Sequence, residues 1–261
     1  MNKAFLPLLF PLIASAGMSA KEAMDKNEDA RALSSMVCHA KLITGGGEDT
    51  TRVKEFTWWR KLQTDNEHFN TMTRFHTPAE IKNEGILFLE HPQDESDVLL
   101  YLPSYKKIRR VERASQSGSF MGSELSYADI ATPHVSDFSY KMIREEACPT
   151  TSKVKCWVIE SVPLREQTRE RTGYYRSTQW VRQDNYMWEK IENYGADSTI
   201  IKRLEASNIT EVDTAKHKWM GLKLYVTNPK NSKYTNMEFS NVKANVEIQD
   251  SVFTQQNLSK P

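Results

Sequence analysis

Side chains that commonly do chemistry are thinly scattered along this chain of 261 residues. None of its six histidines lies in an HxxxH or HExxH spacing and no CxxC pair is present, so the sequence predicts no metal centre. No GxSxG turn surrounds Ser119 or Ser123, which flank a Met-Gly pair. The adjacent Glu145 and Glu146 would point to opposite faces of a strand, which is poor geometry for paired acid–base catalysis. We therefore expect a protein that is not an enzyme and that uses no cofactor.

Cys148 and Cys156 are the two cysteines whose spacing predicts a disulfide bond. They bracket a turn-like stretch between two strand-like segments, and an antiparallel hairpin would bring their Cα atoms into bridging range. Closing so short a loop stabilises a fold by about 2–3 kcal/mol, and the bond requires an oxidising compartment. Cys38 is left over and is expected to be a buried thiol near the end of a helix.

A basic stretch at residues 106–113 stands out in a chain whose 35 basic residues nearly balance its 34 acidic residues. The near-neutral total argues against a nucleic-acid-binding protein. The basic side chains of the stretch are Lys106, Lys107, Arg109, Arg110 and Arg113. One interpretation is a cationic lip beside a flap that carries Phe120 and Met121, which would suit an amphiphile with an anionic head. The alternative is a solvated strand end whose arginines pair with Glu112 and Glu124.

Residues 1–20 have the pattern of a secretory signal peptide. Lys3 precedes an apolar run over residues 4–13, and small residues suitable for cleavage follow at Ala14-Ser15-Ala16 and at Met18-Ser19-Ala20. A membrane anchor is the alternative, but the apolar run is shorter than the about 20 residues that a spanning helix needs. We therefore expect a mature chain of residues 21–261 that crosses the inner membrane and folds as one domain in the periplasm.

Among the elements that would position these residues, the first is an amphipathic helix predicted from Lys21 to about Thr44. Ala30, Leu33 and Met36 recur within it at the spacing of one helical face, and Gly45-Gly46-Gly47 would end it. No Lys-Ser or Lys-Thr pair follows the glycines, so they do not indicate a phosphate-binding loop.

From residue 52 onward the chain consists of short stretches rich in β-branched and aromatic residues, separated by turn signals. No amphipathic helices alternate with them, so antiparallel strands are expected, in one curved sheet, a barrel or a sandwich. Short helices are expected at residues 122–130 and 251–258. The predicted strands are residues 53–62, 68–75, 85–91, 96–111, 137–147, 155–162, 174–183, 186–194, 198–207, 222–228, 234–242 and 243–249.

Two of these strands are apolar on both faces, at residues 86–89 and 98–102. One face of such a strand could pack on a helix while the other lines a cavity. Alternatively, both faces belong to an ordinary core, as they do in central strands.

Residues 101–130 carry a resemblance to a known family, the LolA-like outer-membrane lipoprotein-sorting proteins, in their larger branch. The segment with the pattern FMGS-x-x-SY-x-D, at residues 120–129, is the specific part, and weaker matches cover most of the chain from about residue 25. The chain departs from the family pattern at Gly173-Tyr174-Tyr175, which follows an unusually charged stretch. The other matching residues of this region are Tyr101-Leu102-Pro103, Arg109-Arg110 and Tyr127-Ala128-Asp129-Ile130.

The resemblance implies a mainly β fold, an antiparallel half-open barrel of roughly eleven strands with short helices closing one side around an apolar cavity. It also implies a function, namely the non-catalytic binding and transfer of a lipid or an acylated lipoprotein during outer-membrane biogenesis. Partners of such relatives include RND-type exporters of the inner membrane, and the protein is expected to be a monomer. Residues 118–130 are the candidate hinge and lid.

Candidate residues for the cavity wall and its lid are aromatic, aliphatic or basic, and the sequence does not say which strand faces turn inward. Two other functions remain open: an envelope interaction module that carries no ligand and docks an exporter, and a hydrolase of envelope lipids. The candidates are Trp58, Phe75, Phe88, Leu100, Leu102, Arg109, Arg110, Phe120, Met121, Tyr127, Tyr140, Trp157 and Trp180.

Overall fold

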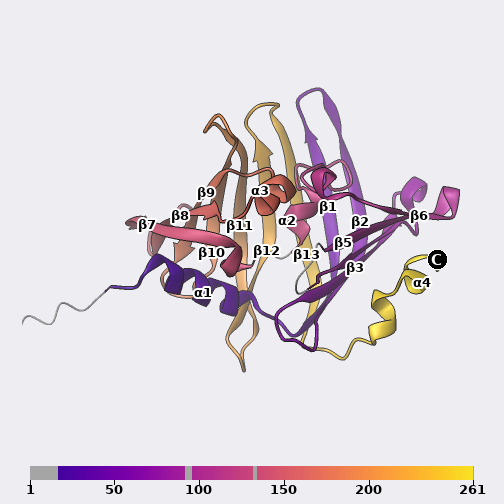
Figure 1. Ribbon diagram of the computed structural model, residues 1–261, viewed down its shortest axis with the longest axis horizontal. Helices are drawn as coiled ribbons and strands as arrows, with labels where there is room; N and C mark the ends of the chain where they lie inside the picture. Colours follow the sequence, from indigo (N-terminus) through magenta and orange to yellow (C-terminus); the bar gives the residue numbers. More distant parts are fainter. Residues whose placement is uncertain (1–16, 92–95, 132–133, 261) are drawn as a thin grey trace, which may run out of the picture.

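The computed structural model describes residues 17–91, 96–131 and 134–260, so most of the predicted signal peptide lies outside the described residues. Its main element is one antiparallel sheet of thirteen strands in the order β6-β5-β4-β3-β2-β1-β13-β12-β11-β10-β9-β8-β7 (Figure 1). The sheet does not close into a barrel, because β6 and β7 form its two edges. The strands are β1 Ser35–Gly46, β2 Asp49–Leu62, β3 Phe69–Thr77, β4 Gly85–Leu89, β5 Asp97–Leu102, β6 Lys107–Arg110, β7 Phe138–Ala147, β8 Lys155–Pro163, β9 Arg176–Arg182, β10 Trp188–Tyr194, β11 Ile200–Asp213, β12 Lys218–Asn228 and β13 Lys233–Ala244.

Four α-helices accompany the sheet in the described part of the chain: α1 Ala20–Arg31, α2 Tyr127–Ile130, α3 Glu166–Thr172 and α4 Gln255–Leu258. Ser19 caps the start of helix α1, and its side chain and that of Glu22 form a capping box. It lies across β7 and β12, and Ala23 and Met24 pack with Trp157 of β8 (Figure 1). No helix in the described ranges is long and apolar enough to cross a membrane.

The sheet buries side chains on both faces. We call the face covered by α1, by residues 111–131 and by residues 134–137 the inner face, and the face on which the C-terminal residues 245–260 pack the outer face. Phe75 and Ile86 point to the inner face, whereas Met72 and Leu87 pack on the outer face with Leu258. The strands at 86–89 and 98–102 are therefore apolar on both faces because both faces are core.

The helix predicted from Lys21 to Thr44 is wrong beyond Arg31, where α1 ends. Residues 35–46 form β1, which alternates between buried and half-buried side chains. Met36, Ala40 and Leu42 point to the inner face, a period of two that the spacing of Leu33 and Met36 concealed. The glycine triplet forms the β1–β2 turn instead of a helix end, with Gly46 and Gly47 at φ of 92° and 61°.

The strand count of roughly eleven is too low, and two local features add strands to the predicted set. Residues 35–46 form β1 where a helix was predicted, and residues 96–111 form two strands, β5 and β6, because Pro103 starts a turn of 3-10 helix between them. One feature removes a strand, since β13 ends at Ala244 and residues 245–249 are not a strand. Helix α3 was missed because its stretch, Glu166–Thr172, is charged and has no apolar periodicity.

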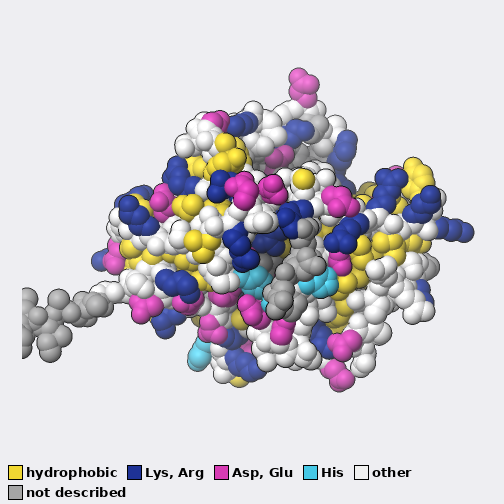
Figure 2. Space-filling view, in the orientation of Figure 1, with side chains coloured by type: hydrophobic (Ala, Val, Ile, Leu, Met, Phe, Trp, Pro, Cys, Tyr) yellow, Lys and Arg dark blue, Asp and Glu magenta, His cyan; other side chains and the backbone are white. Residues whose placement is uncertain are grey.

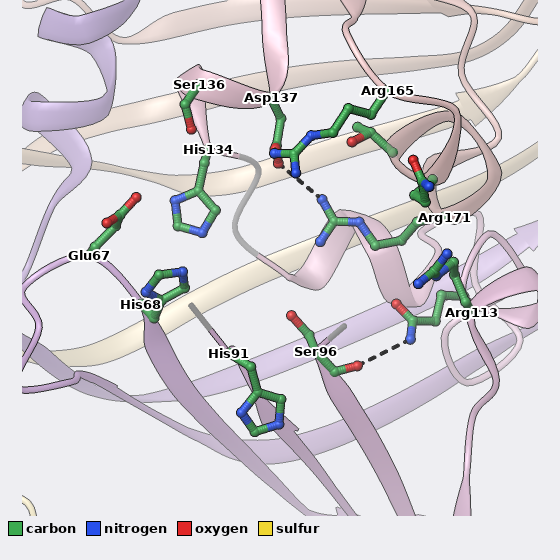
Figure 3. A pocket seen from close by; sticks show the side chains of 13 residues that line it. Glu67, His68, His91, Ser96, Arg113, His134, Ser136, Asp137, Arg165 and Arg171 are labelled. Carbon is green, nitrogen blue, oxygen red and sulfur yellow. Dashed lines mark hydrogen bonds and ion pairs between the residues drawn. The ribbon is translucent and has the colours of Figure 1, made fainter. Parts of the chain in front are cut away.

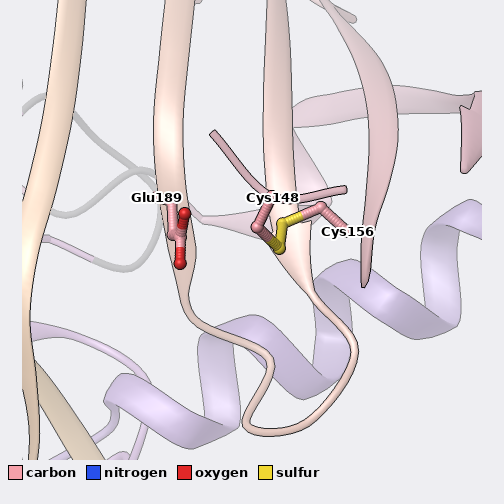
Figure 4. A group of neighbouring side chains, drawn as sticks. All are labelled: Cys148, Cys156 and Glu189. Atoms are coloured by element: carbon pink, nitrogen blue, oxygen red, sulfur yellow. A yellow bond between two sulfur atoms is a disulfide. The ribbon is translucent and has the colours of Figure 1, made fainter. Parts of the chain in front are cut away.

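The predicted disulfide is confirmed. Cys148 and Cys156 are bonded across the β7–β8 hairpin with their Cα atoms 5.0 Å apart (Figure 4). The fully buried Glu189 beside them accepts hydrogen bonds from Arg182 (2.7 Å) and from the backbone of Thr150 (2.9 Å), so its role is structural. Cys38 is buried on β1, not near a helix end, and burial raises the pKa of its thiol to about 12, which makes it unreactive.

Candidate functional site

Residues 118–130, which we call the flap, form a compact loop that leads into α2. Ser119 and Ser126 are paired as an isolated bridge, and the Phe120 amide donates a hydrogen bond of 2.7 Å to the Leu125 carbonyl. Met121 and Gly122 turn the chain between them with φ values of 52° and 73°. The sequence therefore folds this segment into a tight turn whose two apolar ends, Phe120 and Leu125, lie side by side.

The flap inserts those two side chains into the inner face of the sheet. Phe120 is fully buried, and its ring centroid lies 6.2 Å from that of Phe56 and 6.3 Å from that of Phe75. Leu125 belongs to the same cluster, and Tyr127 meets the Phe120 ring edge-on at 5.8 Å. In this conformation Phe120 and Leu125 of the flap fill part of the inner face, where the resemblance implied an apolar cavity.

Most of the predicted wall residues meet in this cluster. Trp58, Phe75, Phe88 and Phe120 are buried in it, and the Trp58 indole N–H has no hydrogen-bond partner among the described residues. Leu100, Met121 and Tyr127 are half-buried at its margin, and Leu102 is half-buried at the end of β5. The resemblance thus selected residues that lie together on the inner face, around the flap.

The other five predicted residues lie elsewhere. Tyr140 and Trp157 are part of the cluster beneath α1. Trp180 packs on the opposite face of β8 and β9 with the disulfide, and its indole N–H donates to Glu146. Arg109 and Arg110 are neighbours on β6, so they point to opposite faces of the sheet.

The expectation that the arginines of the basic stretch pair with Glu112 and Glu124 does not hold for Arg110. Its guanidinium instead lies 2.7 Å from Asp97 on the adjacent strand β5.

A buried ion pair holds the flap against the sheet. Asp129 accepts hydrogen bonds from Lys202 Nζ (2.5 Å) and from the Tyr174 hydroxyl (2.6 Å), and it also caps α2 together with Ser126. Burial alone would raise the pKa of Asp129, but the Lys202 ammonium and the hydrogen bonds outweigh it, so this pKa lies below its ordinary value. We call Asp129, Lys202 and Tyr174 the latch.

Sequence reasoning missed the partners in the latch. Lys202 belongs to a strand pattern, in which a lysine normally faces solvent, whereas here it points to the inner face and is buried. Tyr174 stands in the segment that departs from the family pattern, directly after Gly173 ends α3 with φ of 74°. A lysine flanked by the apolar residues of β11 is the signal that could have revealed the pair.

A pocket of about 400 Å³ opens at the base of the flap, and we call it the His–Arg pocket (Figure 3). Basic side chains gather with histidines near the centre of this face of the molecule (Figure 2). The acidic residues that line the His–Arg pocket are Glu67 and Asp137. The basic and imidazole side chains that line it are His68, His91, His134, Arg113, Arg165 and Arg171.

A second pocket of about 400 Å³ lies between α1 and the strands β2 and β3. It shares Glu67, His134 and Ser136 with the His–Arg pocket, so the two are adjacent. Its lining adds apolar side chains, among them Leu62 and Phe69, to the charged residues of α1.

Comparison with solved structures shows that the fold is shared. The chain is similar to a DUF1329-family protein from Desulfovibrio piger, with a TM-score of 0.84, 23% identity, and coverage of 92% of this chain and 97% of that one. A putative outer membrane lipoprotein-sorting protein domain from Vibrio parahaemolyticus matches with a TM-score of 0.83, 18% identity, and coverage of 92% and 98%. A LolA superfamily protein from Nitrosomonas europaea matches with a TM-score of 0.72, 18% identity, and coverage of 92% and 100%.

Sequence comparison gives the family. No curated protein matches the chain. A family model described as an uncharacterized protein matches residues 67–260, which is more than half of the chain. The sequence belongs to that family, and it shares its fold with the proteins described as a lipoprotein-sorting domain and as a LolA superfamily protein.

Proposed function

We propose that the protein binds a lipid or an acylated lipoprotein in the periplasm and passes it on without chemical change. The observation that carries this proposal is the flap, which places Phe120 and Leu125 against an apolar sheet face that an acyl chain would otherwise cover. A similar fold in a protein described as a lipoprotein-sorting domain supports the same reading.

The energetics favour exchange of the flap for a ligand. Burying an acyl chain gains about 0.8 kcal/mol per methylene group, whereas withdrawing Phe120 and Leu125 costs about 1.5–3 kcal/mol for each side chain. The latch adds to this cost, because Asp129 and Lys202 would separate. An acyl chain of ordinary length therefore gains enough to displace the flap, and reclosure of the flap would offset part of the cost of releasing the ligand.

Two features of the chain support a periplasmic location. The N-terminal sequence has the pattern of a signal peptide, and the disulfide between Cys148 and Cys156 requires an oxidising compartment. An inner-membrane exporter of the RND type is the partner we propose for loading, and we propose that the carrier acts as a monomer.

Native mass spectrometry and lipid extraction of the mature protein test the proposal. We expect a co-purified amphiphile, or uptake of a fluorescent fatty acid from vesicles. Phe120→Ala should change the uptake, because it empties part of the inner face. Met72→Ala is the matched control, since it removes a similar buried side chain from the outer face. Absence of any bound or acquired amphiphile in the wild type would contradict the carrier function.

One observation favours a second function, an envelope interaction module that docks an exporter and carries nothing. The interior around Phe120 is filled by the protein itself, as such a module would require. Exporter binding by a protein that acquires no lipid would establish this alternative.

A further inference from the structure

The His–Arg pocket has a lining suited to a charged group and unsuited to a hydrocarbon. Three guanidinium groups face it against the two carboxylates of Glu67 and Asp137, and three imidazoles complete the ring of polar side chains. The lining is thus positive by one charge with neutral histidines, and each protonated histidine adds to the excess.

Two of the arginines keep most of their hydrogen-bonding capacity. Arg165 and Arg171 approach different oxygens of Asp137, at 2.7 and 3.5 Å (Figure 3). Each guanidinium has five N–H donors, and within the described residues Arg171 uses only one, in that long contact, although it is largely buried. A guanidinium that is only 19% exposed and has so few partners is a site at which an oxyanion would bind.

The histidines are held in place by carboxylates behind the pocket. His68 Nδ1 lies 2.8 Å from Asp65, His91 Nε2 lies 3.1 Å from Asp97, and His134 Nε2 lies 3.6 Å from Glu90. The rings of His68 and His134 are 5.2 Å apart.

Glu90 favours the protonated form of His134. The hydrogen bond to Glu90 raises the pKa of His134, burial opposes this rise, and the charges of Asp137 and Glu28 add to it.

We propose that the His–Arg pocket binds a phosphate group, and that in the carrier this group is the head of an anionic lipid whose acyl chains lie beneath the flap. The head-group part rests on the proposed function, whereas the phosphate site stands without it. The position fits this role in two ways. The backbone carbonyl of Gln116, which lines the pocket, accepts a hydrogen bond from the Ala128 amide of the flap, and Arg171 lies at the end of α3, three residues before Tyr174 of the latch.

Calorimetry with matched probes tests the proposal. The probes are inorganic phosphate, dihexanoylphosphatidic acid and dihexanoylglycerol, of which the last has the same acyl chains without the phosphate. We expect phosphatidic acid to bind more tightly than the glycerol lipid. Arg165→Gln and Arg171→Gln should each weaken phosphatidic acid about tenfold and leave the glycerol lipid unchanged.

Arg169→Gln is the control, because Arg169 lies on the same helix but pairs with Glu166 and does not line the pocket. Arg165 is 66% exposed, so its variant keeps the test valid even if Arg171→Gln disturbs folding.

The outcomes separate the two proposals. Phosphate binding that both arginine variants weaken, with no lipid binding, would support the pocket and contradict the carrier. If the two lipids bind equally well and the variants do not affect them, the proposed phosphate site is wrong and the carrier function is supported. If none of the three probes binds, the proposed phosphate site is wrong, and so is the proposal that the cargo is an anionic lipid.

Discussion

Asp129 connects the flap to the sheet through one buried ion pair. Removing one partner of such a pair leaves the other charge buried and uncompensated, which typically costs about 3–5 kcal/mol. We predict a loss of this size in the free energy of unfolding for Asp129→Asn, measured by urea denaturation, with faster hydrogen exchange in residues 118–130. Asp25→Asn, in the exposed pair with Lys21, should cost less than about 1 kcal/mol. Equal losses in the two variants would contradict the latch.

His134 gives the molecule a pH dependence of predictable sign. Its folded-state pKa is raised, chiefly by Glu90, above the unfolded value of about 6.5. The stabilisation from this pair is therefore complete below that pH and disappears as the pH rises through the folded-state pKa. In an NMR titration we expect the His134 midpoint above 6.5, and a lower midpoint in Glu90→Gln. A midpoint that does not move in this variant would show that Glu90 is not the cause.

At the scale of elements, the sequence predicted the presence of strands better than the residues at which they begin and end. The antiparallel sheet, the β7–β8 hairpin with its disulfide, and the flap region all follow from local patterns. The helix predicted to Thr44 failed because Ala30, Leu33 and Met36 combine the end of α1 with the start of β1. Helix α3 failed because its charged residues show no apolar stripe.

The candidate site was predictable only in part. Phe120 lies in a recognisable motif, and its burial shows that this residue of the motif has a structural role. The His–Arg pocket could not be read from the chain, because His68, His134 and Arg171 are far apart in sequence and have no motif of their own. Their association depends on the order of strands in the sheet.

The start of α1 predicts where the mature chain begins. Met18 packs on the cluster beneath α1 and Ser19 caps the helix, so cleavage after Ala20 would remove both. We predict cleavage after Ala16, which intact-mass measurement of the secreted protein would show. Loss of the cap alone, in Ser19→Ala, should cost about 1 kcal/mol in thermal or urea unfolding. A mature chain that begins at Lys21 would refute this prediction.

For the molecule as a whole, the disulfide links stability to compartment. The variant with both Cys148→Ser and Cys156→Ser should unfold at lower urea concentration, with a loss of about 2–3 kcal/mol because the closed loop is short. Cys38→Ser is the control for the loss of a thiol elsewhere in the core. Dithiothreitol should lower the midpoint of the wild type and leave that of the double variant unchanged; sensitivity of both would point to another cause.

The open sheet has a consequence for how copies of the chain behave at high concentration. Among the described strands, β6 is hydrogen-bonded only to β5, so its other side presents backbone groups with which another strand could pair. Its side chains include Lys107, Arg109 and Arg110, which are exposed. If two molecules paired through their β6 edges, these positive charges would come close together. The repulsion protects the open sheet against edge-to-edge aggregation into fibrils.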